Sequence, residues 1–288
     1  MKSLRGKVAV ITGAASGIGK AIAERFARAE MKLVLVDIEE GALENSANEL
    51  RADGADILTR VVDVAEADQM DALRDLVFDH FGTAHVICNN AGVASAGKTW
   101  ELTTADWEFT MRPNIWGVIH GIRVFGPRLI EQGEGHFVNT ASMAGLVAMG
   151  NMAPYNVTKF GVVALSETLY WDLKNEGTDV GVSVLCPAFV NTQIWNSERN
   201  RPAHLKNAPG DTSSSDSRKN QSVIKNVVQS GIPAEIVADR VHDAVIQNEL
   251  YILTHSATIP AIEKRMGHII KGENPTRDNS SLEDLTKS

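Results

Sequence analysis

Two side chains with proton-transfer chemistry, Tyr155 and Lys159, stand four positions apart in the run Tyr-Asn-Val-Thr-Lys. On a helix, residues with this spacing lie on one face, one turn from each other. A free phenol has a pKa of about 10, and a nearby ammonium group favours the phenolate by charge attraction. The pair is therefore able to act as an acid or base near neutral pH. Alone, however, it is more typical of an ordinary amphipathic helix, so its meaning depends on the rest of the chain.

A glycine-rich turn follows the first apolar run of the chain, residues 8–11. Gly13, Gly17 and Gly19 have the spacing Gly-x-x-x-Gly-x-Gly, which differs from the commoner Gly-x-Gly-x-x-Gly fingerprint. Glycines let the backbone approach a pyrophosphate closely, and a helix N-terminus offers it free N–H groups and a positive dipole. A tight strand-to-helix turn also needs glycine, but the place of this one between an expected strand and an expected helix predicts a dinucleotide site.

An acidic residue, Asp37, ends the second apolar run, eighteen positions after Gly19. A carboxylate at this point accepts hydrogen bonds from both ribose hydroxyls of adenosine and repels a 2′-phosphate. The next residue is Ile38 and not Arg, and the residue before Gly17 is Ser16 and not a basic one. These choices favour NAD over NADP, although a surface aspartate that simply ends a strand remains the alternative.

Polar or small residues also end the third and fourth apolar runs. Asp63 follows the third run, where we expect it to meet the adenine ring. The stretch Asn-Asn-Ala-Gly at residues 89–92 ends the fourth run. We expect this small-residue turn to pass under the cofactor, while an Asn side chain ties neighbouring strand ends together.

Apolar runs alternate with longer amphipathic segments along most of the chain. The runs are rich in Val and Ile and lack a two-residue alternation, as strands buried on both faces do. Strand–helix alternation implies a parallel sheet with right-handed crossovers and helices on both faces. We therefore predict an α/β, doubly wound, single-domain fold. The expected strands are residues 8–11, 33–36, 57–62, 86–88, 135–139, 180–185 and 250–253, and the expected helices 17–29, 42–52, 67–81, 104–131, 153–176, 233–248 and 258–270.

Composition narrows the class of protein. The 288 residues are 43% hydrophobic, enough for a full core, and the formal net charge of −8 without a basic block argues against binding nucleic acid or an anionic membrane. Cys88 and Cys186 sit in apolar runs and are expected to be buried thiols in a reducing compartment. No run reaches membrane-spanning length, and the start of the chain leads at once into the first strand. We expect a cytoplasmic protein.

Domain organisation is expected to be simple, with residues 1–272 as one dinucleotide-binding and catalytic domain. Residues 196–232 are polar and contain Ser213, Ser214 and Ser215, so they form either a surface insertion or a lid over the substrate. Residues 273–288 are charged and rich in polar residues, and we expect a flexible tail.

The glycine turn at residues 12–19, the Asn-Asn-Ala-Gly run, Ser142 and Tyr155-x-x-x-Lys159 occur in this order and at a familiar spacing. With these motifs the chain resembles the single-domain short-chain dehydrogenases/reductases, over about residues 6–192. Each motif is weak alone, but the set is highly specific. The resemblance implies a Rossmann-like seven-stranded parallel sheet, a nicotinamide cofactor and usually a homodimer or homotetramer.

The resemblance also implies catalytic roles. Tyr155 would be the general acid/base, Lys159 would lower its pKa and hold the nicotinamide ribose, and Ser142 would hydrogen-bond the substrate oxygen. Asn114 would hold a water in the proton relay to Lys159. Its predecessor Pro113 is unusual, because it removes a helix N–H and can kink the helix.

Near the nicotinamide, the run Cys-Pro-Ala at residues 186–188 departs from the family's usual Pro-Gly and narrows the space slightly. Thr192 matches the threonine that binds the carboxamide. The full set of residues expected to bind the cofactor is Gly13, Ser16, Gly17, Ile18, Gly19, Asp37, Asp63, Val64, Asn90, Ala91, Gly92, Tyr155, Lys159, Pro187, Val190 and Thr192.

The substrate is expected over the nicotinamide, in mostly apolar surroundings. No Arg or Lys stands out in the sequence to bind a carboxylate or phosphate, so we predict a neutral, apolar, fairly bulky secondary alcohol or ketone. Plain core packing is the alternative for the larger apolar residues. The residues expected to contact the substrate are Ser142, Ala144, Tyr155, Phe189 and Trp195, with Met149 and residues 93–96 and 143–146 close by. The resemblance implies that the long helices pack between subunits, so an interface is expected to contain Trp107, Trp116, Tyr170 and Trp171.

The leading hypothesis is an NAD-dependent alcohol dehydrogenase or ketoreductase that transfers a hydride and needs no metal; the eight histidines show no ligand-like spacing. Its partner would be a small-molecule substrate and a second copy of the chain. The main alternative is a non-catalytic NAD(H)-sensing regulatory protein of the same fold. Epimerisation or dehalogenation is a third reading, but an epimerase would need a larger C-terminal domain and a dehalogenase would lack the Ser–Tyr–Lys set.

Overall fold

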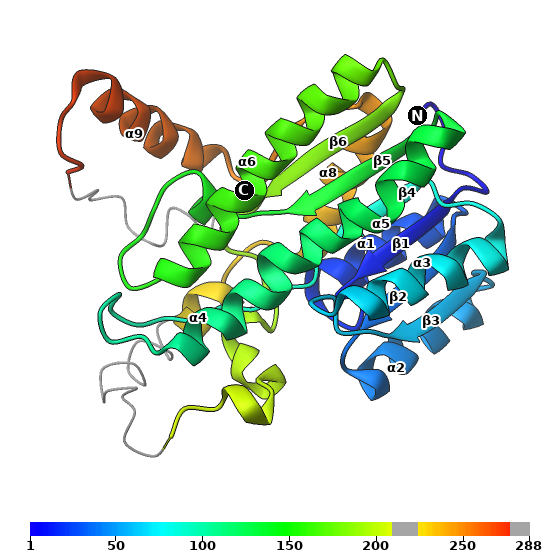
Figure 1. Cartoon of the computed structure of the whole chain (residues 1–288), viewed down its shortest axis with the longest axis horizontal. Helices are drawn as coiled ribbons and strands as arrows, with labels where there is room; N and C mark the ends of the chain where they lie inside the picture. The colour runs from blue at the N-terminus through cyan, green and yellow to red at the C-terminus, as the bar shows by residue number, and fades with distance from the viewer. Residues whose placement is uncertain (209–223, 277–288) are drawn as a thin grey trace.

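The computed structural model describes residues 1–208 and 224–276. Its centre is a seven-stranded sheet in the order β3-β2-β1-β4-β5-β6-β7, with every neighbouring pair parallel (Figure 1). This confirms the predicted doubly wound, Rossmann-like single domain. The strands are β1 (Val8–Thr12), β2 (Lys32–Asp37), β3 (Ile57–Val61), β4 (Val86–Asn89), β5 (Gly135–Thr140), β6 (Val180–Cys186) and β7 (Tyr251–Leu253).

Helices cover both faces of the sheet, and β1 illustrates why its sequence shows no alternation. Ala9 and Ile11 pack with helices α1, α2 and α8, whereas Val8 and Val10 pack with α3, α5 and α6. Successive strand residues point to opposite faces, and here both faces are buried. The helices are α1 (Gly17–Arg28), α2 (Glu40–Ala52), α3 (Ala67–Phe81), α4 (Thr104–Met111), α5 (Gly117–Gln132), α6 (Ala153–Glu176), α8 (Ala234–Gln247) and α9 (Ile259–Lys271).

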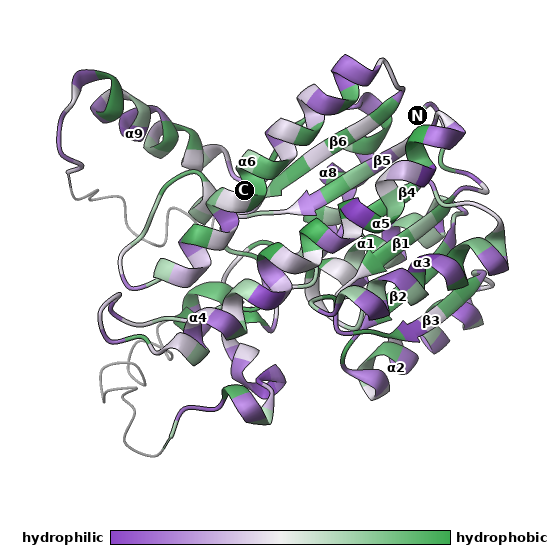
Figure 2. Cartoon of the chain, viewed as in Figure 1, coloured by the Kyte–Doolittle hydropathy of each residue, from purple (hydrophilic) through white to green (hydrophobic). Residues whose placement is uncertain are grey.

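Hydropathy follows these layers. Figure 2 shows hydrophobic residues along the central strands and hydrophilic residues on the outward turns of α2 and α3. Cys88 and Cys186 are buried free thiols, as predicted. Among the helices within residues 1–208 and 224–276, none combines the length and the apolar character needed to cross a membrane.

The helical region predicted for residues 104–131 is interrupted. Between α4 and α5 lies one π-helical turn, η1 (Arg112–Trp116), in which the N–H of Gly117 donates to the carbonyl of Arg112. Pro113 has no N–H and its ring clashes with the preceding turn of a regular helix. A wider π turn accommodates this, and π turns inside helices frequently occur at functional sites.

The described part of the polar segment after β6, up to residue 208, contains regular turns and buried side chains. It forms two 3-10 turns, η3 (Ile194–Asn200) and η4 (Ala203–Leu205), which bury Ser197 and Leu205. Another short 3-10 turn, η2 (Met143–Gly145), follows β5, and η5 (Ser256–Thr258) precedes α9. The serine run at residues 213–215 and residues 277–288 of the expected tail lie outside the described residues.

Candidate active site

A cleft of about 890 Å³ opens at the carboxyl ends of the parallel strands. The chain leaves β1 toward β2 on one side, while β4 begins the other half of the sheet. Ligands of open α/β sheets bind at such a topological switch point. All but two of the predicted site residues, Gly19 and Asn114, line this cleft.

The glycine turn is shaped by close approaches of backbone. At Gly13, which has φ of +69°, an added Cβ would lie 2.9 Å from the Cα of Ala91. A Cβ on Gly19 would lie 2.1 Å from the carbonyl oxygen of Gly13, so Gly19 allows the turn to close without itself lining the cleft. Gly17 has φ of +56° and lies against Thr192. The cradle that the predicted pyrophosphate requires is therefore present, at the N-terminus of α1.

Asp37 holds the edge of this cradle. Its carboxylate accepts hydrogen bonds from the N–H groups of Ala15, Ile38 and Glu39 at 2.7–3.0 Å. Burial raises the pKa of Asp37, against the opposing effect of these backbone donors. Each carboxylate oxygen can accept more than one hydrogen bond, so the side chain is fixed in place and still able to accept from ribose hydroxyls.

Strand ends beside the cradle are tied by the asparagines, as predicted. The Asn90 amide donates to the carbonyl of Thr12 at 3.0 Å and accepts from the Thr140 hydroxyl at 3.2 Å. The Asn89 amide donates to Asn139 at 2.9 Å. These contacts join β1, β4 and β5 where the cleft opens.

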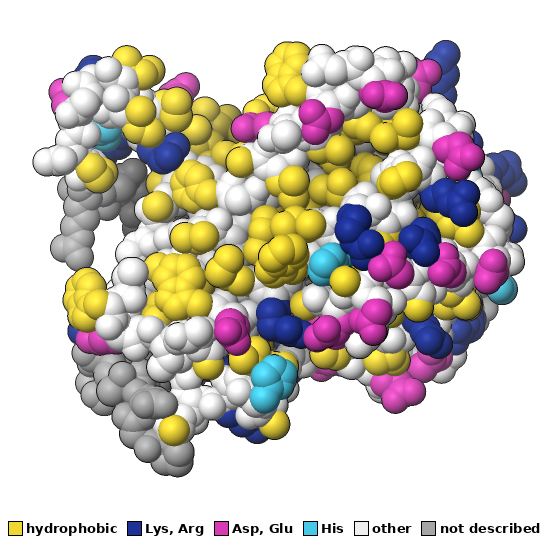
Figure 3. All heavy atoms as spheres, in the orientation of Figure 1, with side chains coloured by type: hydrophobic (Ala, Val, Ile, Leu, Met, Phe, Trp, Pro, Cys, Tyr) yellow, Lys and Arg dark blue, Asp and Glu magenta, His cyan; other side chains and the backbone are white. Residues whose placement is uncertain are grey.

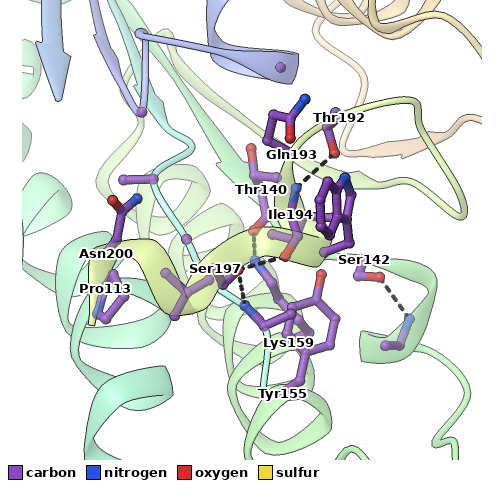
Figure 4. A pocket seen from close by; sticks show the side chains of 18 of the residues that line it. Pro113, Thr140, Ser142, Tyr155, Lys159, Thr192, Gln193, Ile194, Ser197 and Asn200 are labelled. Carbon is purple, nitrogen blue, oxygen red and sulfur yellow. Dashed lines mark hydrogen bonds between the residues drawn. The ribbon is translucent and has the colours of Figure 1, made fainter. Parts of the chain in front are cut away.

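Ser142, Tyr155 and Lys159 lie together in the cleft, Ser142 just after β5 and the other two on α6 (Figure 4). The Ser142 hydroxyl accepts from the N–H of Ala144 at 3.1 Å and donates to the Pro187 carbonyl at 3.3 Å. The Lys159 Nζ donates to the Thr140 carbonyl at 2.7 Å and lies 5.5 Å from the centre of the Tyr155 ring. The structure thus assembles the predicted triad.

Burial dominates the electrostatics of this triad. It raises the pKa of Tyr155, while the Ser142 hydroxyl acts in the opposite direction. It also lowers the pKa of Lys159 to about 8. The sequence predicted that Lys159 would lower the pKa of Tyr155. In the structure the pKa of Tyr155 is raised instead, because burial disfavours the charged forms of both side chains.

Asn114 is fully buried in the π turn, and its side chain has a structural task. Its Oδ1 accepts from the N–H of Val93 at 2.8 Å, and its Nδ2 donates to the Val93 carbonyl at 2.9 Å and to Thr158 at 3.2 Å. The side chain thereby joins α6 to the segment after β4. A role in a proton relay would belong to its backbone and stays a prediction.

The part of the cleft around the triad has large apolar residues in its lining, and their contact with a substrate stays a prediction. Met149, Phe189 and Trp195 line it, as predicted. Sequence reasoning missed several apolar lining residues that come from α4 and from the polar segment. These are Phe109, Leu205, Ile224, Val227 and Val228. The last four are apolar residues within an otherwise polar stretch of the sequence, and this contrast was the available signal.

Sequence reasoning also missed the basic side chains on the cleft wall, Lys98, Arg112 and Arg199. Each contacts an acidic residue. Lys98 lies 2.9 Å from Glu101, Arg112 pairs with Asp63 and Glu66, and Arg199 lies 2.7 Å from Glu39. Within the described residues, no cluster of three or more His, Cys, Asp or Glu side chains is arranged to hold a metal ion.

Comparison with known proteins decides the family. Residues 7–203 match the family model described as short chain dehydrogenase. The chain belongs to this family. It is 36% identical to the CLA biosynthesis dehydrogenase/reductase of Lactiplantibacillus plantarum, over 94% of this chain and 95% of that protein. It is 39% identical to the 1-deoxy-11-beta-hydroxypentalenate dehydrogenase of Streptomyces exfoliatus, over 66% of this chain and 70% of the relative.

A solved short-chain dehydrogenase/reductase has nearly the same structure. The enzyme from Burkholderia phymatum, crystallised in complex with NAD, superposes with a TM-score of 0.95 and is 43% identical, over 98% of this chain and 100% of that one. Our protein is thus an oxidoreductase of the short-chain dehydrogenase family with a site for a nicotinamide cofactor. The glycine cradle, in which a Cβ would collide with neighbouring backbone, fits such a cofactor.

Proposed function

We propose that this short-chain dehydrogenase interconverts a neutral, apolar, fairly bulky secondary alcohol and its ketone, with NAD(H) as cofactor and Tyr155 as the general acid/base. The observation that carries the proposal is the triad: the half-buried Tyr155 lies with the buried Ser142 and Lys159 where the dinucleotide cradle meets the apolar half of the cleft. A bound nicotinamide supplies the acceptor or donor of the hydride.

The protein's own residues handle the substrate oxygen and its proton. In the oxidation direction, the Tyr155 phenolate takes the proton of the alcohol, and Ser142 fixes the same oxygen by a hydrogen bond. Burial raises the pKa of Tyr155, so the phenolate needs a positive charge nearby. Lys159, charged below its pKa of about 8, provides one. In reduction, Tyr155 returns the proton to the oxygen.

We propose NAD over NADP because the adenosine end of the cleft carries acidic and apolar groups. Asp37, Ile38 and Glu39 line it in sequence. A 2′-phosphate would meet two carboxylates, and the Arg199 guanidinium nearby already binds Glu39. The Burkholderia phymatum relative, which was crystallised with NAD, supports the same choice.

The substrate class rests on the apolar wall of the cleft. Phe109, Met149, Phe189 and Trp195 supply large apolar surfaces around the triad. The basic side chains on the wall contact acidic partners, which leaves the lining without a strong excess of charge. A relative named as a hydroxypentalenate dehydrogenase supports a hydroxylated compound.

We also propose a cytoplasmic homodimer or homotetramer, since its cysteines are free thiols and its long helices expose apolar surface. Trp116 on η1 is 49% exposed and Trp171 on α6 is 63% exposed. Figure 3 shows hydrophobic side chains gathered on the face formed by α4, α5 and α6. Contact between such faces would bury both tryptophans.

The test is a screen of secondary alcohols against NAD and NADP, followed by absorbance of the reduced cofactor, with Tyr155→Phe beside the native protein. We expect turnover with NAD on apolar alcohols, and a loss of turnover of about a thousandfold or more in Tyr155→Phe because the ring can no longer exchange a proton. NADH binding, measured by fluorescence, should persist in the variant. Near-full activity of Tyr155→Phe would sink the catalytic assignment, and NADH binding without turnover on any alcohol would favour the sensor alternative.

A further inference from the structure

A short segment of the chain, residues 190–200, crosses the cleft and is called the strap here. It begins with Val190 and Thr192 beside the glycine cradle, where Thr192 lies against Gly17, and it continues through η3. Figure 4 shows Thr192, Ile194, Ser197 and Asn200 along the strap, in the same pocket as the triad. Asp37 and Tyr155 line the same cleft as the strap, so a dinucleotide that reached from one to the other would pass along it.

One side of the strap is fastened near the substrate half of the cleft. Ser197 is 4% exposed, and its hydroxyl accepts from the N–H of Ala94 at 2.9 Å. The same hydroxyl donates to the carbonyl of Ile194 at 2.6 Å. Ser197 thus joins the strap to the segment that follows β4.

The other side is fastened at the adenosine end by Glu39, two residues after Asp37. The Nε and Nη2 of Arg199 donate to the Glu39 carboxylate at 3.1 and 2.7 Å, and the Asn200 amide donates to it at 2.9 Å. The remaining guanidinium nitrogen, Nη1, donates to the carbonyls of Gln193 and Asn196 within the strap. Arg199 therefore stabilises the conformation of the strap and also joins the strap to Glu39 at the adenosine end of the cleft.

This contact is stronger than an ordinary surface pair. The Arg199 and Glu39 side chains are 29% and 30% exposed, so both are partly shielded from water. Burial by itself would raise the pKa of Glu39, but the hydrogen bonds from Arg199 and Asn200 and the arginine charge outweigh it and lower the pKa. Charge-assisted hydrogen bonds to a planar guanidinium are among the strongest that side chains form.

We propose that Glu39, through Arg199 and Asn200, latches the strap over the bound dinucleotide and thereby limits the rate at which it leaves. The inference rests on the proposed NAD(H) cofactor. The strap is bound to Ala94 on one side of the cleft and to Glu39 on the other. The cofactor would then be enclosed between the strap and the floor of the cleft. Release then requires the Glu39 contacts to break. Glu39 and Arg199 act as positioning residues and take no part in the proton transfer.

The experiment measures NADH dissociation by stopped-flow displacement, with no alcohol present, from the native protein and from Glu39→Gln and Arg199→Gln. We expect dissociation about tenfold faster in each variant, the change that roughly 1.4 kcal/mol produces. The double variant should match the single ones, because both remove the same contact. Raising the salt concentration should speed release from the native protein toward the rate of the variants.

Glu39→Gln separates the latch from simple charge effects. The Glu39 carboxylate repels an anionic cofactor, so removing its charge would by itself slow NADH dissociation. Loss of the latch would instead speed dissociation. Arg25→Gln is the control, since Arg25 forms a comparable long-range pair with Asp239 between α1 and α8; its NADH dissociation should be unchanged. Normal NADH binding with unchanged dissociation in both latch variants, or equal acceleration in Arg25→Gln, overturns the latch alone. A native protein that binds no NADH overturns the proposed function as well.

Discussion

At the scale of single residues, the site contains two ionisable groups, Tyr155 and Lys159, whose charged forms are both disfavoured by burial. Lys159 is buried and Tyr155 is half-buried, and burial lowers the pKa of Lys159 to about 8 from an ordinary 10.5. At neutral pH the lysine is charged in the folded and in the unfolded chain, so its burial costs stability. Active sites commonly accept such a cost for function.

Lys159→Met should therefore stabilise the fold while it abolishes turnover. At pH 7 we expect an unfolding free energy higher by about 1–3 kcal/mol, the burial cost less the lost bond to the Thr140 carbonyl. Between pH 8 and 10.5 the unfolded chain holds a proton that the folded native protein has released, so native stability rises with pH and the gain shrinks. Urea unfolding at pH 7 and pH 10 measures this, with Lys174→Met on the exposed side of α6 as control. A Lys159→Met protein less stable than the native one at pH 7 would contradict the burial argument.

At the scale of elements, α5 is placed by a glycine that meets the asparagine network. A Cβ on Gly121 would lie 1.9 Å from the Oδ1 of Asn89, and Asn89 is itself held by Asn139. The close approach of α5 to the end of β4 therefore depends on the absence of a side chain.

Two glycines of the same helix give a matched test of this packing. Gly121→Ala should lower the unfolding free energy by about 1–3 kcal/mol, because the asparagine cannot move without losing its partner. Gly126→Ala should instead leave stability unchanged or raise it by about 0.5–1 kcal/mol, since its Cβ would find only an ordinary 4.0 Å contact with Phe137 and alanine favours a helix. Thermal unfolding of both variants decides the matter, and equal effects would rule out the packing account.

At the scale of the whole molecule, charge and apolar surface are segregated on the face of Figure 3. The α3 side carries ion pairs, among them Arg123 with Asp71. The helices beside it expose Trp116 and Trp171. Large exposed apolar patches are typical of interaction surfaces, and the proposed self-association through this face would cover them.

Trp116→Glu should shift the protein toward smaller species in sedimentation velocity, because a carboxylate would be buried without a partner at the proposed interface. Trp171→Glu should act in the same direction. Val61→Glu, at the exposed edge strand β3 and 43% exposed in the native protein, serves as control and should leave the distribution unchanged. A native protein that sediments as a monomer would remove the proposed interface.

The amino-acid sequence alone determined the fold class and most of the predicted residues that line the cleft. Alternating apolar runs and amphipathic segments require a parallel sheet with helices on both faces, and the ends of parallel strands meet at one edge. Motifs at strand ends, such as the glycine turn and Asp37, could therefore be placed before any coordinates. Tyr155 and Lys159 could be paired because residues four positions apart lie on one face of a helix, one turn from each other.

The tertiary structure decided what depends on burial and on contacts between distant residues. Glu39 and Arg199 are 160 positions apart, and no local pattern pairs them. The rise in the pKa of Tyr155 comes from the packed surroundings of the ring and not from its neighbours in sequence. Spacing and periodicity indicate which residues belong to one helix or strand. Burial of a side chain, and contacts that join the two sides of the cleft, arise only when all the elements are packed together.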